Sequence, residues 1–190
     1  MIPFYFFTDR LLAATIIPVL PRRLTPNHLT VFRFLTVPVV FFLLVGQYYL
    51  VSGLIFVLAV FTDALDGALA RTTNQISDWG KLFDPLADKL LIGSTAAVLV
   101  TRFLSFRLAV AIVAVELLLI LSAYYHKYYR RYEIQANYLG KTKMVFQSLG
   151  LLTLFGGVIF SWPILSRISE GALYLALVFA FLSFFGYRSI

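Results

Sequence analysis

The chain has 190 residues, of which 61% are hydrophobic and 13% charged, and its mean hydropathy is +0.88. These values exclude an ordinary soluble globular domain and predict an integral membrane protein. The absence of cysteine excludes a disulfide framework and a thiolate metal site. The net charge of +7 accompanies no nucleic-acid-binding pattern, so we expect attraction to an anionic lipid surface and no nucleic acid as partner.

Residues 1–24 precede the first apolar stretch and are interpreted as a juxtamembrane segment. The segment lacks a basic n-region and a small-residue cleavage site, which argues against a removable signal peptide. Five apolar residues predict one side of a short interfacial helix, or a plain membrane anchor: Leu11, Leu12, Ile16, Val19 and Leu20. We interpret residues 1–190 as a single membrane domain that includes this segment.

Six apolar segments follow, each near the roughly 20 residues that cross a bilayer. They comprise residues 29–46, 49–71, 85–101, 107–126, 144–163 and 170–187. Thr25 followed by Pro26 is typical of an N-cap and a first helical position. We therefore expect an all-α integral membrane protein with six transmembrane helices, a short N-terminal interfacial helix and both termini on one side.

The positions of lysine and arginine predict the orientation of this bundle. Of the 16 Lys and Arg residues, only Arg102, Arg107 and Arg167 fall on the side opposite to the N-terminus. Because cytoplasmic segments carry an excess of basic residues, the N-terminus is expected in the cytoplasm. The Asp-rich turn between the second and third helices then faces the cytoplasm, and we expect a bacterial cytoplasmic membrane.

Aspartates gather around this turn in a helical pattern. At 100° per residue, four residues share one stripe about 100° wide on the second helix: Asp63, Asp66, Gly67 and Ala70. Asp84 and Asp88 are four residues apart and share a stripe on the next helix. A short turn over residues 72–83 would make the two helices antiparallel neighbours, so we expect the four carboxylates to converge.

Carboxylates that converge in or near hydrocarbon are costly, and like charges at close range add to the cost. A divalent cation removes both problems, and ligation by oxygen alone suits Mg²⁺, Mn²⁺ or Ca²⁺ rather than zinc. Four carboxylates can hold two ions, which is an arrangement that polarises a phosphoryl group. Gly67 and Ala70 leave room for a planar ring or a diphosphate, or permit close helix packing. Arg71 either pairs with a phosphate or extends to the membrane surface.

The spacing of these residues resembles, without a gap or a substitution, the signature of the CDP-alcohol phosphotransferase family, whose members make phospholipids. The eight fixed positions lie within 26 residues and are Asp63, Asp66, Gly67, Ala70, Arg71, Gly80, Asp84 and Asp88. The resemblance implies a homodimer with a polar cavity open to the cytoplasm. It also implies transfer of a lipid-linked phosphate from a CDP-activated lipid, such as CDP-diacylglycerol, to an alcohol, with release of CMP.

The resemblance further implies roles for individual residues. Asp63, Asp66 and Asp84 would ligate Mg²⁺ or Mn²⁺, with two ions per site, and Asp88 would be the general base and touch the second ion. The CDP-lipid would contact Asp66, Gly67, Ala70, Arg71 and Gly80, together with Asn27 and Thr30. These last two belong to "PNHLT", which looks like the family's Pro-Asn-x-x-Thr start of helix one, or they cap that helix.

The acceptor alcohol is expected from a weaker resemblance. "GKTKMVFQ", Gly140–Gln147, is similar to the Gly-Lys-x-Lys-Thr-x-x-Gln start of helix five in phosphatidylglycerophosphate synthases, with Met144 in place of Thr. These synthases also carry an Arg-Glu pair in helix four, where this chain has Val115 and Glu116. We expect glycerol 3-phosphate as acceptor, with an inositol phosphate or phosphatidylglycerol as alternatives. Its phosphate is expected at Arg130, Arg131, Lys141 and Lys143.

Glu116 itself lies deep in an apolar segment. It is expected to face the protein interior, where it bonds either to a substrate hydroxyl or to a neighbouring helix. Two non-enzymatic interpretations of the chain also exist. A cation transporter would bury carboxylates, but it should show interrupted helices and repeat symmetry, which the sequence lacks. An inactive lipid-binding scaffold would have lost a motif aspartate, and all four are present.

Overall fold

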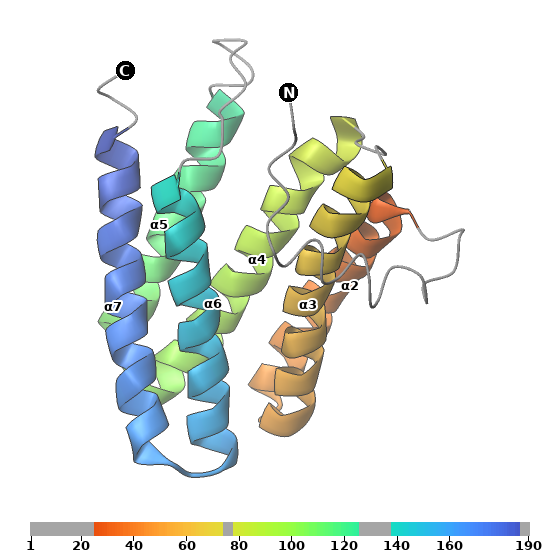
Figure 1. The fold of residues 1–190 in the computed structure, drawn as a ribbon. Coiled ribbons are helices and arrows are strands. Elements are labelled where there is room, and N and C mark those ends of the chain that lie inside the picture. Colours follow the sequence, from red (N-terminus) through yellow and green to blue (C-terminus); the bar gives the residue numbers. More distant parts are fainter. Residues whose placement is uncertain (1–24, 74–77, 126–137, 187–190) are drawn as a thin grey trace.

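The computed structural model describes residues 25–73, 78–125 and 138–186, and the regular secondary structure in these ranges is entirely helical. The helices are α2 (Pro26–Val45), α3 (Tyr49–Thr73), α4 (Asp78–Phe103), α5 (Phe106–Tyr125), α6 (Tyr138–Ile159) and α7 (Pro163–Gly186). Successive helices run in opposite directions (Figure 1). The all-α class is confirmed, whereas the predicted interfacial helix of residues 1–24 lies outside the described residues.

Among the described residues, three helical segments are both long and apolar enough to cross a membrane, namely Pro26–Val45, Tyr138–Ile159 and Pro163–Ser183. Tyr49–Asp63 is a shorter apolar helix. The protein is thus an integral membrane protein. Six crossings stay a prediction, because α3, α4 and α5 combine their apolar residues with charges that must be accommodated inside the bundle.

Helix α2 begins where the sequence predicts. Thr25 is the N-cap residue, with φ −104° and ψ 156°, and Pro26 occupies the first turn. The backbone N–H of Thr25 donates to Nδ1 of His28 at 3.2 Å, which satisfies a donor that the helix leaves unpaired. A proline at this position has the backbone angle that a helix needs, so the start of α2 is fixed locally.

The predicted boundary between the last two helices is wrong. The fifth segment was expected at 144–163 and the sixth at 170–187, but α6 starts at Tyr138 and ends at Ile159, and α7 starts at Pro163. Ser161 has a left-handed φ of 55°, and the following proline initiates α7. The predicted segments place the break at residues 164–169, which are helical in the structure.

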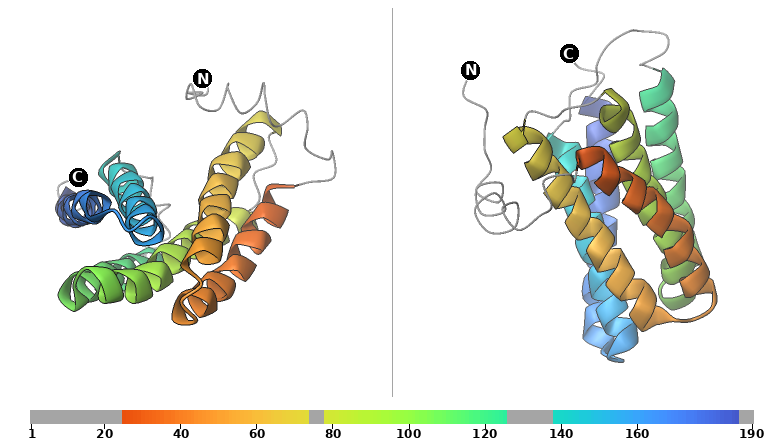
Figure 2. Two further views of the ribbon diagram at one scale, coloured as in Figure 1. Left: turned by 90° about the horizontal axis from the view of Figure 1, so that it is seen from below. Right: turned by 90° about the vertical axis from the view of Figure 1, so that its right-hand side faces the viewer.

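Short connections gather at one end of the bundle, the lower end in Figure 1, at residues 46–48, 104–105 and 160–162. Helix α2 packs along both α3 and α4, α4 packs on α5, and α6 packs along α7, as the two views of Figure 2 also show. Contrary to the prediction of direct neighbours, α3 and α4 make few contacts with each other. Helix α2 joins them instead, so three helices rather than two form the carboxylate region.

The apolar core lies toward the end with the short connections. Its fully buried members come from every described helix and include Val40, Leu44, Phe56, Leu99, Ile112, Leu151, Leu154 and Leu173. Arg102 of α4 reinforces this end, since its Nη1 donates to the carbonyl of Leu44 at 2.8 Å and its Nη2 to that of Val45 at 3.2 Å. The carbonyl of Leu44 also accepts from the backbone N–H of Gln47 at 3.1 Å, so Arg102 strengthens the C-terminal cap of α2. The opposite end of the bundle is left for polar side chains.

Helices α6 and α7 approach closely because α6 carries small residues at the contact. A Cβ atom at Gly157 would lie 2.7 Å from Oγ of Ser166 and 3.1 Å from its backbone nitrogen. The hydroxyl of Ser169 donates to the carbonyl of Gly150 at 2.7 Å across the same contact. Small residues and interhelical hydrogen bonds of this kind drive helix association in membranes.

We therefore expect Gly157→Leu to lower the thermal unfolding midpoint of the detergent-purified protein. The added side chain meets backbone atoms of α7 that cannot rotate away, and overpacking of this kind costs about 1–3 kcal/mol. Gly171→Ala on α7 is the matched control, because a Cβ there meets nothing within 4 Å. Equal unfolding midpoints for the two variants, measured by differential scanning fluorimetry, would contradict this packing.

Candidate active site

The centre of the polar region is a buried arginine, Arg33 of α2, whose side chain is 0% exposed. Its Nη1 lies 2.8 Å from Oδ1 of Asp88 on α4 and 3.5 Å from Oδ1 of Asp63 on α3. Its Nη2 donates to Oδ2 of Asp66 on α3. One guanidinium therefore contacts carboxylates from two helices that barely touch each other.

Helical spacing explains why these groups meet. Asp63 and Asp66 are three residues apart on α3, and Asp84 and Asp88 are four apart on α4, so each pair lies on one helix face. On α2, Thr30 precedes Arg33 by one turn. The Thr30 hydroxyl donates to Oδ1 of Asp84 and is also 3.3 Å from the carbonyl of Pro26. The side chains of Thr30 and Arg33 on α2 thus both face the carboxylates.

The four carboxylates differ in burial. The side chain of Asp63 is 43% exposed, whereas those of Asp66 and Asp88 are 6% and 11% exposed, and Asp84 is partly buried. Asp63 therefore lies on the solvent side of the cluster. A polar substrate that approaches the site meets Asp63 first and the Asp66 and Asp88 carboxylates deeper inside.

The donor set of this site suits a hard divalent cation, because it offers carboxylate oxygens and neither histidine nor cysteine. With all four aspartates ionised, Arg33 compensates one charge and three negative charges remain, since 4 − 1 = 3. Among the described residues, however, no three carboxylates or histidines are close enough together to hold one metal ion. Three of the carboxylates face the guanidinium instead. The carboxylate oxygens are suitable ligands for a metal ion, and the guanidinium of Arg33 lies among them.

The residues expected at the CDP-lipid are placed to different extents. Asn27 and Thr30 lie in the first turns of α2, and Gly80 is buried near the start of α4. Gly67, Ala70 and Arg71 lie in the last turns of α3, on the C-terminal side of Asp66. Their side chains fall outside those that the structure describes. The start of α2, the end of α3 and the start of α4, where these positions lie, are at the same end of the bundle (Figure 1).

The basic residues expected at the acceptor phosphate do not share one environment. Arg130 and Arg131 lie outside the described residues. Lys141 is exposed on the first turn of α6, with Nζ 6.0 Å from the centre of the Tyr138 ring. Lys143 is 4% exposed and forms an ion pair with Glu116 of α5. The structure thus separates the two lysines and gives Glu116 a neighbouring helix as its partner.

The Glu116–Lys143 pair belongs to a second polar cluster beside the carboxylates. Gly93 of α4 faces it, since a Cβ there would lie 4.0 Å from Cβ and Cγ of Glu116. Lys89, which is partly buried on α4, interacts electrostatically with Glu116, Lys143 and Asp88. Oε2 of Glu116 and Oε1 of Gln147 are buried without a hydrogen-bond partner. Lys89 therefore links the charges of the two clusters.

Sequence reasoning missed Arg33 and Lys89 as site residues. Arg33 lies inside a segment that is otherwise apolar, and an arginine inside a membrane helix signals an interior partner. Its position three residues after Thr30 places it on the same face as an expected ligand. Lys89 directly follows Asp88 and was counted only as a contribution to membrane orientation.

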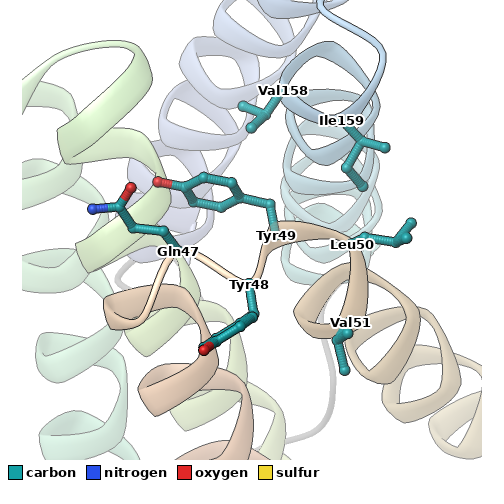
Figure 3. Close-up of a pocket in the computed structure, with 7 residues that line it drawn as sticks. All are labelled: Gln47, Tyr48, Tyr49, Leu50, Val51, Val158 and Ile159. Carbon is teal, nitrogen blue, oxygen red and sulfur yellow. The ribbon is translucent and has the colours of Figure 1, made fainter.

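Figure 3 shows an open pocket of about 410 Å³ at the end of the bundle with the short connections. It is lined by Gln47, Tyr48, Tyr49, Leu50, Val51, Val158 and Ile159. Gln47 is 14 residues from Arg33, which corresponds to about 20 Å along a helix. The lining contains no charged group, so this pocket is not where the polar chemistry takes place.

Comparison with known proteins agrees with the site. A family model described as CDP-alcohol phosphatidyltransferase matches residues 23–185. A protein of Sodalis glossinidius named CDP-diacylglycerol--glycerol-3-phosphate 3-phosphatidyltransferase is 33% identical over 172 residues, which cover 85% of this chain and 91% of the relative. A protein of the same name from Salmonella choleraesuis is 32% identical over 136 residues, covering 68% of this chain and 75% of the relative.

Other relatives match over a smaller share of their length. The protein of that name from Mycoplasma genitalium is 38% identical over 104 residues, which cover 54% of this chain and 44% of the relative. The match thus spans less than half of that relative. The family model, by contrast, runs from just before α2 to the end of α7 and includes both polar clusters. On this evidence the chain belongs to the CDP-alcohol phosphatidyltransferase family.

Proposed function

We propose that the protein transfers a phosphatidyl group from CDP-diacylglycerol to glycerol 3-phosphate and releases CMP. The observation that carries this proposal is the set of four aspartates at one end of a membrane bundle, three of them around one buried guanidinium. The names of the relatives, which specify CDP-diacylglycerol and glycerol 3-phosphate, support the two substrates.

The family resemblance supports the metal roles of the aspartates, and their all-oxygen donor chemistry agrees with it. Asp63, Asp66 and Asp84 would hold Mg²⁺ or Mn²⁺, and Asp88 would contribute to a second ion. Such ions would supply positive charge at the diphosphate of the CDP-lipid and at the phosphate that departs with CMP. Asn27, Thr30 and Gly80 lie beside the nucleotide, together with Gly67, Ala70 and Arg71 at the end of α3.

Asp88 is the general base of the proposed reaction. Its carboxylate accepts the proton of the acceptor hydroxyl while that oxygen forms a bond to the lipid-linked phosphorus. The bond between this phosphorus and the bridging oxygen of the diphosphate breaks, and CMP leaves with the bonding electrons. The proton then passes from Asp88 to solvent on the side of the partly exposed Asp63.

The acceptor phosphate is assigned to the outer edge of the site. Lys143 is already neutralised by Glu116, whereas Lys141 is exposed at the start of the same helix. A dianion needs a charge-assisted partner, so Lys141 is the preferred contact, with Arg130 and Arg131 as further candidates. Because Val115 replaces the arginine of phosphatidylglycerophosphate synthases, an inositol phosphate or phosphatidylglycerol is the second candidate acceptor.

The surroundings of the protein are part of the proposal. The excess of basic residues on one side supports a bacterial cytoplasmic membrane with the active site facing the cytoplasm. The six helices are proposed to cross this membrane as one domain, and the family resemblance supports a homodimer. A cation transporter or an inactive scaffold would not release CMP.

The proposed reaction is tested by CMP release from purified protein in detergent with CDP-diacylglycerol, Mg²⁺ and a panel of alcohols. We expect glycerol 3-phosphate to support turnover, and we expect EDTA to abolish it, because carboxylates alone do not neutralise a diphosphate. Ca²⁺ is expected to bind without supporting turnover. Full activity in thoroughly chelated enzyme would disprove the metal roles. If only another alcohol supports turnover, that alcohol and not glycerol 3-phosphate is the acceptor.

The base and the metal ligands are distinguished by single substitutions to asparagine. Asp88→Asn is expected to lower kcat by about 10²–10⁴ while CDP-lipid binding stays nearly intact, because the lost group acts on the acceptor proton. Asp63→Asn and Asp66→Asn are expected to weaken metal and nucleotide binding together. Isothermal titration with Mn²⁺ and a CDP-lipid, beside steady-state kinetics, measures both effects. Equal loss of binding in all three variants would contradict this division of roles.

The two lysines at the start of α6 are expected to behave differently. Lys141→Ala should raise the KM for glycerol 3-phosphate about tenfold, since a charge-assisted contact contributes roughly 1.5–3 kcal/mol, with little change in the KM for the CDP-lipid. Lys143→Ala should instead destabilise the protein, because it leaves Glu116 buried and unpaired. The double variant Lys143→Met with Glu116→Leu is the control and should recover stability. An unchanged acceptor KM for Lys141→Ala would favour an unphosphorylated alcohol.

A further inference from the structure

We propose that Arg33 is an internal counter-cation of the carboxylate site, which holds Asp63, Asp66 and Asp88 together and competes with the divalent cation for their charge. This inference rests on the proposed function in one respect, namely that these carboxylates bind metal. Arg33 is thus assigned as a positioning residue.

The first argument is the burial of the guanidinium. Arg33 is 0% exposed, and burial of a cation is tolerated only where anions and hydrogen bonds replace its hydration. Asp66 accepts a hydrogen bond from Nη2, and Asp88 and Asp63 lie 2.8 Å and 3.5 Å from Nη1. The cation and the carboxylates therefore depend on each other for their stability in the membrane.

The second argument is the place of Arg33 between the helices. Asp63 and Asp66 lie on α3 and Asp88 lies on α4, and these helices make few direct contacts. Arg33 reaches both from α2, which packs along each of them. Without this charge, carboxylates of the two helices would face each other, and the Thr30–Asp84 hydrogen bond would join α2 to α4 but not to α3. Repulsion would then separate α3 from α4.

The third argument is that Arg33 neither uses all its hydrogen-bond donors nor compensates all the carboxylate charge of the site. A guanidinium has five N–H donors in a fixed plane, yet Nε and Nη1 of Arg33 are buried without a hydrogen bond of good geometry. Nη1 interacts with Asp88 as an ion pair at 2.8 Å and not as an aligned donor. One positive charge also faces three carboxylates. Charge, more than directed hydrogen bonding, retains the arginine, and the carboxylates keep oxygen lone pairs for a second cation.

A divalent cation that binds these oxygens weakens their attraction to Arg33. A metal ion bound to the same carboxylates as the guanidinium would be close to it, so the two cations also repel each other. Metal affinity is therefore lower than the carboxylates alone would give, while the protein without metal is more stable than it would be without Arg33. A substitution that removes the charge should change both quantities in opposite directions.

The test uses full-length protein in detergent without substrate, and compares wild type with Arg33→Met and Arg33→Lys. Thermal unfolding midpoints are measured in EDTA and in saturating Mg²⁺, and the Mn²⁺ dissociation constant is measured by electron paramagnetic resonance. In EDTA, Arg33→Met should unfold at least about 5 °C below wild type. Mg²⁺ should restore most of this loss, and Mn²⁺ should bind on the order of tenfold more tightly. Arg33→Lys keeps the positive charge and should stay closer to wild type than Arg33→Met in both quantities.

Arg102→Met is the matched control. Arg102 also joins two helices, through the carbonyls of Leu44 and Val45, but it contacts no carboxylate among the described residues. Its loss should lower the unfolding midpoint equally in EDTA and in Mg²⁺ and leave Mn²⁺ affinity unchanged. If Arg33→Met behaves in this way, Arg33 is only a packing residue and the proposal is wrong.

Two further outcomes are decisive. Weaker Mn²⁺ binding in Arg33→Met or Arg33→Lys would overturn competition and assign Arg33 to the support of the metal ligands. If Arg33→Met does not fold, the Mn²⁺ affinity of Arg33→Gln, which also removes the charge but can still donate hydrogen bonds, decides alone, with a tighter site supporting the proposal and an equal or weaker one overturning it. A wild-type protein that Mg²⁺ does not stabilise and Mn²⁺ does not bind would disprove the metal roles in the proposed function as well.

Discussion

Charge compensation inside a membrane is the constraint on which this structure depends. Four aspartates on α3 and α4 lie in helices whose other residues are largely apolar, and ionised carboxylates are costly there unless cations or donors accompany them. Helix α2 supplies both, through the hydroxyl of Thr30 and the guanidinium of Arg33. The packing of α2 against α3 and α4 is therefore as much an electrostatic requirement as a hydrophobic one.

The bundle places its apolar packing at one end and its buried charges toward the other. At the end with short connections, aliphatic side chains from all six described helices pack together, and Arg102 binds carbonyls at the end of α2. Toward the other end, the buried residues include the charged side chains of Arg33, Asp66, Asp88, Glu116 and Lys143. The apolar end fixes the helices, so the polar end keeps its geometry although charge repulsion acts within it. A substrate-binding site can then be polar without loss of the fold.

Local patterns in the sequence predict the helices and the two aspartate pairs, because apolar runs and three- or four-residue spacings act within a few turns. The same holds for the start of α2 at Thr25 and Pro26. What sequence reasoning could not give are partners distant in the chain. Arg33 contacts Asp66 from 33 residues away, and Lys143 contacts Glu116 from 27 residues away, and no spacing rule selects these pairs. The boundary between α6 and α7 was misplaced for another reason, since hydropathy does not register the proline that initiates a helix.

The pairing of Glu116 with Lys143 changes how an acceptor can be recognised. Where a chain has an arginine before this glutamate, that arginine adds a positive charge on the same helix, and here Val115 adds none. Instead, Lys143 of α6 neutralises the carboxylate of Glu116 on α5. Lys143 is already paired, so in the proposed function the exposed Lys141 contacts the acceptor phosphate at the edge of the site. Lys89 interacts with the Glu116–Lys143 pair and with Asp88, so the charges of the two polar clusters are coupled through α4. The proposed recognition of an anionic acceptor and the proposed activation of its hydroxyl therefore share one electrostatic environment.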